Sequence, residues 1–346
     1  MTDATSTDRL RPAVARGSRF ATAKGAITIV VSTVVLFIVS AIVAPSSVSG
    51  GVIASMLPFA AVLAIAGLGQ MLVVQQGGID LSVPGAMSLA IVVVSHYPNG
   101  DDSRVLTAVL IAVAYAVAAG ALNGLLVGWL GLNSIIATLG TNALLFGAVL
   151  GISNGIPRST TRLLSDVAAG RTLGIPHAAL FALAALLVVA VLTKKTVAGR
   201  RFTAIGANRL AARAVGLRVR SHHTLAFIWA QLLYCLAGIL LAGITAQPTA
   251  FQGNAYLLPS VAVVVLGGTS LLGGRGFPVS TVIAALFLTQ LDQFVLALGV
   301  PFAVQTLVQA AALAGGVALY TVNWAALRAR FGSRPASGPA ATPSSA

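Results

Sequence analysis

The sequence predicts an all-α fold, a polytopic membrane helix bundle of about ten transmembrane helices with broken or re-entrant segments. Of its 346 residues 57% are hydrophobic and 8% are charged, and the mean hydropathy is +0.95, so too little polar surface exists to cover a water-soluble globule. Apolar stretches of about 20 residues, enough to cross a bilayer as helix, recur along the whole chain. Several are interrupted by glycine, proline and polar residues, whose freed backbone groups lipid cannot satisfy.

The expected spans are 25–44, 52–74, 80–97, 104–130, 133–153, 178–196, 223–246, 256–272, 277–299 and 302–322. The third is weak because Pro84 and Gly85 interrupt it, and the fourth is long enough to tilt or bend at Gly120 and Gly124. The first is longer than the core of a secretory signal and no clean A-x-A site follows it, so we expect an uncleaved span.

The distribution of basic residues predicts that both termini are cytoplasmic. With the N-terminus inside, 17 of the 21 Lys and Arg residues lie on the inner side, as the positive-inside rule requires. The net charge of +14 follows this pattern without aromatic interleaving, which argues against a nucleic-acid partner. Residues 1–24 and 323–346 are expected to be disordered cytoplasmic tails around a transmembrane domain at 25–322, within membrane lipid.

The first expected break is QQGGIDLSVP at Gln75–Pro84, where the backbone cannot continue as a lipid-exposed helix. It contains four candidate residues of a broken helix that borders a translocation path: Gly77, Gly78, Asp80 and Ser82. One interpretation of Asp80 is an N-cap, with its carboxylate accepting the first amides of a helix that starts at Leu81. The other is direct contact with a transported solute.

The second expected feature is the segment 197–222, the only long cytoplasmic loop between spans, which includes GRRFTAIGANRLAARAVGLRVR. Its candidate coupling residues are Gly206, Asn208, Arg209, Leu210, Arg213, Val215 and Gly216. Asn208 can cap a short helix over Arg209–Val215 that Gly216 ends. We expect this helix to dock on a cytoplasmic partner, with Leu210 and Val215 as apolar anchors and the two arginines on the rim. The alternatives are a surface-lying amphipathic segment or a loop that only sets orientation.

The third expected feature is VVVLGGTSLLGGRG at 263–276, which ends an apolar stretch in two glycine pairs and a further glycine around Arg275. Its candidate residues are Gly267, Gly268, Thr269, Ser270, Gly273, Gly274 and Gly276. A tight fold at this depth must line a protein-buried or watery path, which indicates a transport protein. The glycines are expected to supply positive φ or close backbone approach, and the alternative is helix packing by small residues.

These segments resemble, over nearly all of residues 50–322, the permease subunits of ATP-binding-cassette importers for ribose, xylose, arabinose and related monosaccharides. Six motifs similar to those of the family occur in the family's order: GGIDLSV at 77–83, IIATLGT at 135–141, NGIP at 154–157, GAN through GL at 206–217, AQPTA at 246–250 and VVLGGTSLLGGRG at 264–276. The resemblance implies a second permease copy or paralogue, cytoplasmic ATPase subunits that hold ATP and Mg, and an extracytoplasmic sugar-binding protein. It also implies a bacterial cytoplasmic (inner) membrane location.

The sequence departs from the family pattern at several positions. Arg209 stands where the family often has an acidic residue, and the pair Asp292-Gln293 resembles an asparagine pair in the ninth span. Gln309 replaces a common Lys in the tenth span, and Tyr256 is followed by apolar residues instead of acidic ones. Asp292 and Gln293, together with Asn142 in the fifth span, are candidate polar residues of the pore.

The chain is predicted to be a permease subunit and not an enzyme. It has no G-x-x-x-x-G-K-[ST] phosphate loop, so it lacks a nucleotide site of that kind, and no cofactor or metal site is expected in it. The predicted function is the translocation path for a monosaccharide that a binding protein delivers and separate ATPase subunits drive. The alternative is a gradient-driven secondary carrier of a small polar solute. Only Asp80 and Asp292 are carboxylates in or beside the spans, which argues against that carrier.

Overall fold

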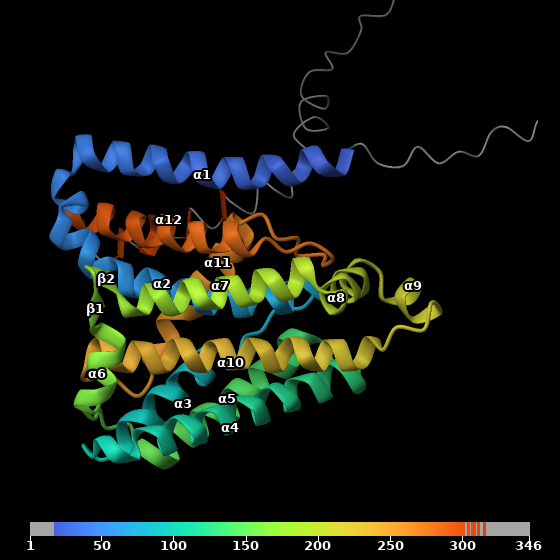
Figure 1. The fold of residues 1–346 in the computed structure, drawn as a ribbon, viewed down its shortest axis with the longest axis horizontal. Helices are drawn as coiled ribbons and strands as arrows, with labels where there is room; N and C mark the ends of the chain where they lie inside the picture. The colour runs from blue at the N-terminus through green and yellow to red at the C-terminus, as the bar shows by residue number, and fades with distance from the viewer. Residues whose placement is uncertain (1–16, 302, 305, 309, 312–313, 316–346) are drawn as a thin grey trace, which may run out of the picture.

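The structure is a computed structural model that describes residues 17–301, 303–304, 306–308, 310–311 and 314–315, and Figure 1 shows an elongated helix bundle. Its elements are α1 (Gly17–Val43), η1 (Pro45–Val48), α2 (Gly50–Gln75), α3 (Val83–His96), η2 (Asp102–Arg104), α4 (Val105–Gly124), η3 (Leu125–Trp129), α5 (Ser134–Ser153), α6 (Arg162–Ala169), β1 (Arg171–Thr172), β2 (Ile175–Pro176), α7 (His177–Lys195), α8 (Val197–Ala207), α9 (Arg209–Ala214), α10 (Val219–Thr245), η4 (Gln252–Tyr256), α11 (Leu257–Leu266) and α12 (Pro278–Ala297).

The all-helical membrane fold is confirmed. In the described part of the chain, seven helical segments are long and apolar enough to cross a membrane: 26–43, 50–75, 102–129, 134–153, 177–195, 219–245 and 278–297. The shorter apolar helices 83–96 and 252–266 cover the weak third stretch and the eighth. The tenth expected span falls largely outside the described residues, and residues 1–16, 323–346 and Gln309 fall wholly outside them. Residues 17–24, expected to belong to the disordered N-terminal tail, instead form the start of α1.

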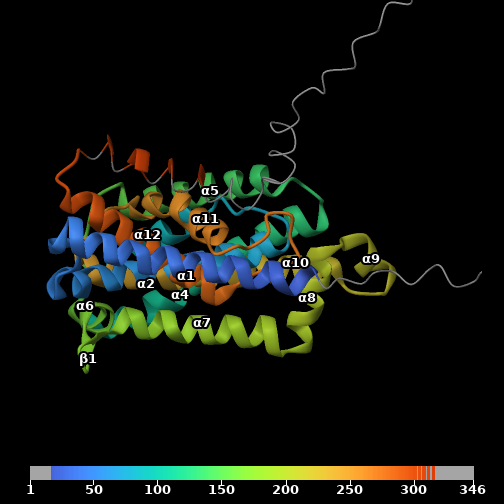
Figure 2. The same cartoon turned by 90° about the horizontal axis from the view of Figure 1, so that it is seen from above.

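Two helices, α2 and α10, form the centre of the bundle. α10 packs against α4, α2 and α3, and α2 also packs against α12, α7 and α11. Both are buried along most of their length. α1 lies at an edge of the bundle, packed against α12 (Figures 1 and 2).

Gly120 and Gly124 allow α4 to approach α10 closely. A Cβ at either position would lie 2.5 Å from a backbone Cα of α10, that of Ile228 or Thr224. The expected irregularity of this span begins just after Gly124, where one turn of π-helix (Leu125–Trp129) continues α4. These small residues therefore set the helix spacing, as is common in membranes.

The end of the bundle opposite α8 and α9 carries α6 and a two-stranded hairpin, neither of which the sequence analysis predicted (Figure 1). β1 pairs with β2 in antiparallel register, Arg171 opposite Pro176 and Thr172 opposite Ile175. Leu173 and Gly174 between the strands both have positive φ, 53° and 80°. Two such residues form the tight turn that the twist of a hairpin favours.

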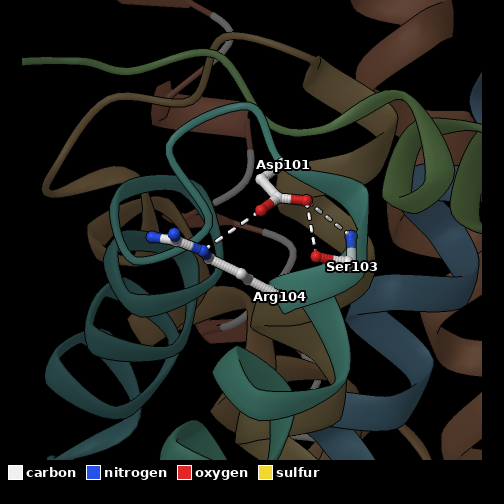
Figure 3. Close-up of polar contacts among 3 residues, drawn as sticks. All are labelled: Asp101, Ser103 and Arg104. Carbon is white, nitrogen blue, oxygen red and sulfur yellow. Dashed lines mark hydrogen bonds and ion pairs between the residues drawn. The ribbon is translucent and has the colours of Figure 1, made fainter.

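At the same end Asp101 fixes the start of η2 and α4 (Figure 3). Its Oδ1 accepts the Ser103 amide at 2.9 Å and the Ser103 hydroxyl at 2.6 Å, and its Oδ2 lies 3.1 Å from Arg104 Nε. The hydrogen bonds from Ser103, more than the charge of Arg104, hold the pKa of the Asp101 carboxyl below its usual value.

Candidate functional site

The first predicted break is confirmed. α2 ends at Gln75, the chain leaves helical geometry with Gly77 at φ 75°, and α3 begins at Val83. The side chains of Gln75, Asp80 and Ser82 are buried, so the non-helical backbone is enclosed by protein. This is the arrangement that the absence of water in a bilayer requires.

Asp80, in the break between α2 and α3, is the centre of a buried polar network that reaches Asn123 on α4 and Gln231 on α10. Its Oδ1 accepts the amide and the hydroxyl of Ser82 at 2.9 and 2.5 Å, and its Oδ2 accepts Gln231 Nε2 at 3.2 Å. Ser82 Oγ also accepts Asn123 Nδ2 at 3.0 Å and Gln231 Nε2 at 2.7 Å. The predicted helix start at Leu81 is wrong, since the helix begins at Val83 with Ser82 in the N-cap position. Asp80 instead closes an Asx turn just before the helix.

The backbone of Asp80 is held as well. In the amide orientation that satisfies both of its ends, Gln70 donates to the Asp80 carbonyl at 3.1 Å and to Tyr234 Oη at 2.8 Å, and it accepts the Asp80 amide at 3.2 Å. Sequence reasoning missed these partners. The available signal was that Gln70, Asn123 and Gln231 are amide side chains inside otherwise apolar spans, where polar groups pair across helices.

α5 holds the other side of the break with three side chains spaced four residues apart. The bonds run from the amides of Ile79, Leu81 and Gly85 to Ser134 Oγ, Thr138 Oγ1 and Asn142 Oδ1, at 3.2, 2.9 and 2.8 Å. They satisfy amides that lack partners at the start of a helix. In this structure Asn142, a candidate pore residue, therefore supports the start of α3.

The second predicted break is also confirmed. Some of its glycines supply positive φ, and others allow close packing. α11 ends at Leu266, so the expected span to 272 is too long. Gly268, Gly273 and Gly274 have φ of 81°, 88° and 77°, a region that costs other residues energy. Thr269 Oγ1 accepts the Phe277 amide at 3.4 Å, and the Ser270 amide donates to the Arg275 carbonyl at 3.1 Å, which closes the loop.

Gly267 and Gly276 have no positive φ; at Gly267 the backbone of α12 leaves no room for a Cβ, whereas at Gly276 the neighbour is the end of the Gln75 side chain. A Cβ at Gly267 would lie 2.9 Å from the amide nitrogen of Thr281, and one at Gly276 would lie 2.6 Å from Gln75 Oε1. Positive φ and close backbone approach, the two requirements expected from the sequence, thus apply to different glycines of the same loop.

The expected coupling segment folds into two helices. α8, Val197–Ala207, was not predicted. The short helix after it was, and it spans Arg209–Ala214, one residue less than expected. Asn208 Oδ1 accepts the Ala211 amide at 3.0 Å, and Gly216 follows the helix with φ 78°, so the predicted cap and stop are confirmed.

The two faces of α9 differ in burial. Ala212 is buried and packs with Ile205 and Val219. Leu210 and Val215 leave 78% and 75% of their surface exposed. Exposed large apolar residues on a short helix at the tip of the molecule indicate a contact surface for another molecule (Figure 1).

Arg209, which is predicted to lie on the rim of a docking surface, also contacts the first break. Its guanidinium turns back and donates through an Nη to the carbonyl oxygen of Gln76 at 2.6 Å. Partial burial lowers the pKa of this guanidinium, which nonetheless stays charged as arginine does in proteins. The bond supplies a donor to a carbonyl that the broken helix leaves free.

The two breaks and α8 meet through their backbones. The Gly274 amide donates to the Gln75 carbonyl at 2.9 Å, and a Cβ at Gly273 would lie 2.5 Å from the Gly206 carbonyl. Gln75 Nε2 donates to Thr203 Oγ1 at 3.0 Å, Gln76 Nε2 to the Phe202 carbonyl at 2.8 Å, and Lys194 Nζ to the Gly276 carbonyl at 2.7 Å. We call this region, Gln75–Gly77 with Phe202–Arg209 and Gly273–Gly276, the glycine junction. A movement of α8 therefore acts directly on both breaks.

Asp292 and Gln293 lie partly buried on α12, away from these contacts. In the described bundle α12 packs mainly on α2, α1 and α11, whereas α5, which carries Asn142, packs mainly on α3. The structure does not bring the three candidate pore residues together.

Residues 52–315 match the protein family described as "Branched-chain amino acid transport system / permease component". The chain is 33% identical over 259 residues to the probable ABC transporter permease protein y4mJ of Sinorhizobium fredii (74% of this chain, 77% of the relative). It is 36% identical over 254 residues to the ribose import permease protein RbsC of Escherichia coli K12 (71% and 78%). It is also 36% identical over 236 residues to the autoinducer 2 import system permease protein LsrC of Enterobacter sp. 638 (67% of each). No solved structure matched the chain.

Proposed function

The chain belongs to this family of ATP-binding-cassette transporter permeases, and we propose that it imports a monosaccharide or a related polyhydroxylated solute. It is a multi-pass membrane protein, and as a permease subunit it leaves nucleotide hydrolysis to separate ATPase subunits. The two relatives named for their solute import ribose and autoinducer 2, which supports a small solute rich in hydroxyl groups.

The observation that carries the proposal is the glycine junction. A permease that separate ATPases drive needs an element that contacts them and also contacts the broken helices of the path. α9 presents Leu210 outward, with the exposed Val215 directly after it, and the adjoining α8 touches both breaks at Gly206. A gradient-driven carrier needs no such element.

In the proposed mechanism the ATPase subunits grip α9 and change their separation when they bind ATP. α8 passes this displacement to the Gln75 carbonyl and to the loop at Gly273 and Gly274, which shifts the two breaks relative to the Asp80 network. ATP must therefore bind the two conformations with different affinity, because only such a difference moves their equilibrium. No group of the permease reacts with the solute.

The orientation follows from charge. The segment 194–220 contains eight Lys and Arg residues and no acidic residue, so α8 and α9 face the cytoplasm in the proposed arrangement. The hairpin end then faces outward, where a sugar-binding protein delivers the solute. The proposed location is the bacterial inner membrane, and the proposed permease works with a second permease copy or paralogue.

The test is uptake by proteoliposomes that contain the chain, its ATPase subunits and its binding protein. We expect radiolabelled ribose or autoinducer 2 to accumulate only with ATP on the α8–α9 side, and to keep accumulating when a protonophore removes the proton gradient. Gradient-driven uptake without ATP would establish the carrier instead. Uptake of leucine in place of both hydroxylated solutes would overturn the assignment of solute class.

The docking surface has a separate test. Leu210→Asp should abolish co-purification of the ATPase, since a charge in the centre of an apolar contact is not compensated. Leu173→Asp is the matched control, because Leu173 is 97% exposed in the hairpin at the opposite end. Full assembly of the Leu210→Asp variant would show that α9 is not the docking helix.

A further inference from the structure

An apolar groove on the outside of the bundle is lined by residues of both α7 and α10. α2 packs against both helices and forms the floor with Leu72, and α8 closes one end with Phe202. The volume of the groove is about 150 Å³. Leu192, Leu225, Ala226 and Trp229 form most of its walls.

The groove opens toward the bilayer. Leu192, Leu225 and Trp229 are 39%, 49% and 43% exposed, and all three belong to segments long and apolar enough to span the membrane. Along α10 the lining runs from His222 to Trp229, which is about 10 Å at 1.5 Å per residue. An occupant that arrives from the hydrocarbon must be an extended apolar chain.

The end of the groove at α8 carries the polar side chains of Thr196 and His222 and adjoins a basic segment of the chain. Thr196 caps α8 by accepting the Gly199 amide at 3.0 Å, which leaves the preceding amides of Val197 and Ala198 as the free amides of a helix N-terminus. Thr196, Ala198 and His222 line this end. Lys195 directly precedes Thr196 and Arg201 lies on α8; both are exposed and belong to the stretch of eight basic and no acidic residues.

We propose that this groove binds an anionic phospholipid, with an acyl chain along α10 and the phosphate at the start of α8. The apolar walls match the chain, and the basic residues and free amides match a negatively charged headgroup. Since α8 carries Gly206 at its other end, the lipid fixes the helix that moves the glycine junction. The site would make transport depend on the charge of the surrounding lipid.

The test is native mass spectrometry of the purified full chain, titrated with phosphatidylglycerol and with phosphatidylcholine of the same acyl chains. We expect phosphatidylglycerol to bind about tenfold more tightly. Ala198→Trp, which fills the polar end of the groove, should weaken phosphatidylglycerol binding by about tenfold, the loss of roughly two buried methylene groups. Ala204→Trp is the matched control, because Ala204 is exposed on the same helix and does not line the groove.

The headgroup site is tested by Lys195→Gln against Arg213→Gln, which removes the same charge from α9. The first should lower the preference for phosphatidylglycerol severalfold and the second should leave it unchanged. Equal binding of the two lipids by the unaltered chain, or unchanged binding in Ala198→Trp, would overturn the proposal, and so would a second copy or another protein found in the groove. These measurements need neither ATPase nor solute, so their failure is separate from failure of the proposed function.

Discussion

Replacing Gly206 with Ala tests whether α8 drives the two breaks. A Cβ at this position would lie 3.0 Å from the amide nitrogen of Gly274, and it would overlap the Gln75 carbonyl oxygen at a separation that real Cβ atoms do not show. Both neighbours are backbone atoms, which cannot swing away as a side chain can. Either α8 or the end of α2 must therefore move.

The size of the effect follows from these contacts. Crowding in a well-packed contact costs about 1–3 kcal/mol. Separation of the Gln75 carbonyl from Gly274 also weakens their 2.9 Å hydrogen bond, a further loss of about 0.5–1.5 kcal/mol. If the two transport conformations differ in this contact, a change of about 1–3 kcal/mol alters their ratio by roughly 5- to 150-fold.

The assay compares solute uptake with ATP hydrolysis in the same proteoliposomes. We expect the Gly206→Ala permease to insert into the membrane and assemble with its partners, which should keep hydrolysing ATP. Its uptake of solute should fall by roughly 5- to 150-fold. Gly51→Ala is the control, because a Cβ there meets no heavy atom within 4 Å and its φ is ordinary. Wild-type uptake coupled to hydrolysis in Gly206→Ala would refute the role given to the glycine junction.

Three further changes address the remaining parts of the site. Arg209→Ala should cut uptake severalfold without loss of ATPase co-purification, because it removes a charge-assisted hydrogen bond to the Gln76 carbonyl. Arg209→Lys should restore part of the uptake. Salt-dependent loss of assembly in the Ala variant would show that Arg209 contacts the ATPase. Asp80→Asn should lower the thermal stability less than Asp80→Ala, because Asn retains an acceptor for the Ser82 amide and each buried group left unpaired costs about 1–3 kcal/mol. Complete loss of uptake in the Asp80→Asn variant at unchanged stability would indicate that the charge of Asp80 is essential. Asp101 has a lowered pKa in the folded protein, so its contribution to stability is complete above the ordinary Asp pKa and is lost as the pH falls through the lowered value. The melting temperature, followed from about pH 5 to pH 2, should show a step that Asp101→Asn removes. An unchanged profile in this variant would count against the role of Asp101 as a cap.

The spans and the breaks could be predicted because they depend on local composition. An apolar run of about 20 residues forms a spanning helix wherever it packs, and glycine pairs inside such a run end it. Boundaries were less accurate. α11 was extended to 272 because Leu271 and Leu272 continue the apolar pattern, although the positive φ of Gly268 has already turned the chain.

α8 was missed although its start signal is present. Thr196 stands before Val197–Ala207 and caps it, but the apolar residues of this 11-residue helix are separated by arginine and glycine. α6 has only eight residues, although Thr161 accepts the Leu164 amide at its start and Leu164 and Ala168 lie on one buried face. Helices this short carry too few apolar positions for periodicity to identify them, and a cap alone is weak evidence.

The pairings in the site could not be predicted from one sequence. Arg209 and Gln76 are 133 positions apart, and Asp80 and Gln231 are 151 apart. No local pattern states which carbonyl a half-exposed arginine reaches. Asp80 was interpreted as a local cap for the same reason, since the turn at Ser82 is visible in the sequence and the helices α4 and α10 beside it are not.

The two sides of the first break differ in how they are held, and under the proposed function this difference determines which part moves. At Asp80 the chain is tied by side-chain hydrogen bonds to three helices, and such directional bonds resist sliding. At Gln75 and Gln76 the chain is tied instead to α8, Arg209 and the second break, by hydrogen bonds that do not involve the Asp80 network. Gly77, with φ 75°, lies between the part tied to α8 and the part tied to the Asp80 network. A displacement of α8 therefore bends the chain near Gly77 and leaves the Asp80 network as the fixed point against which the path opens.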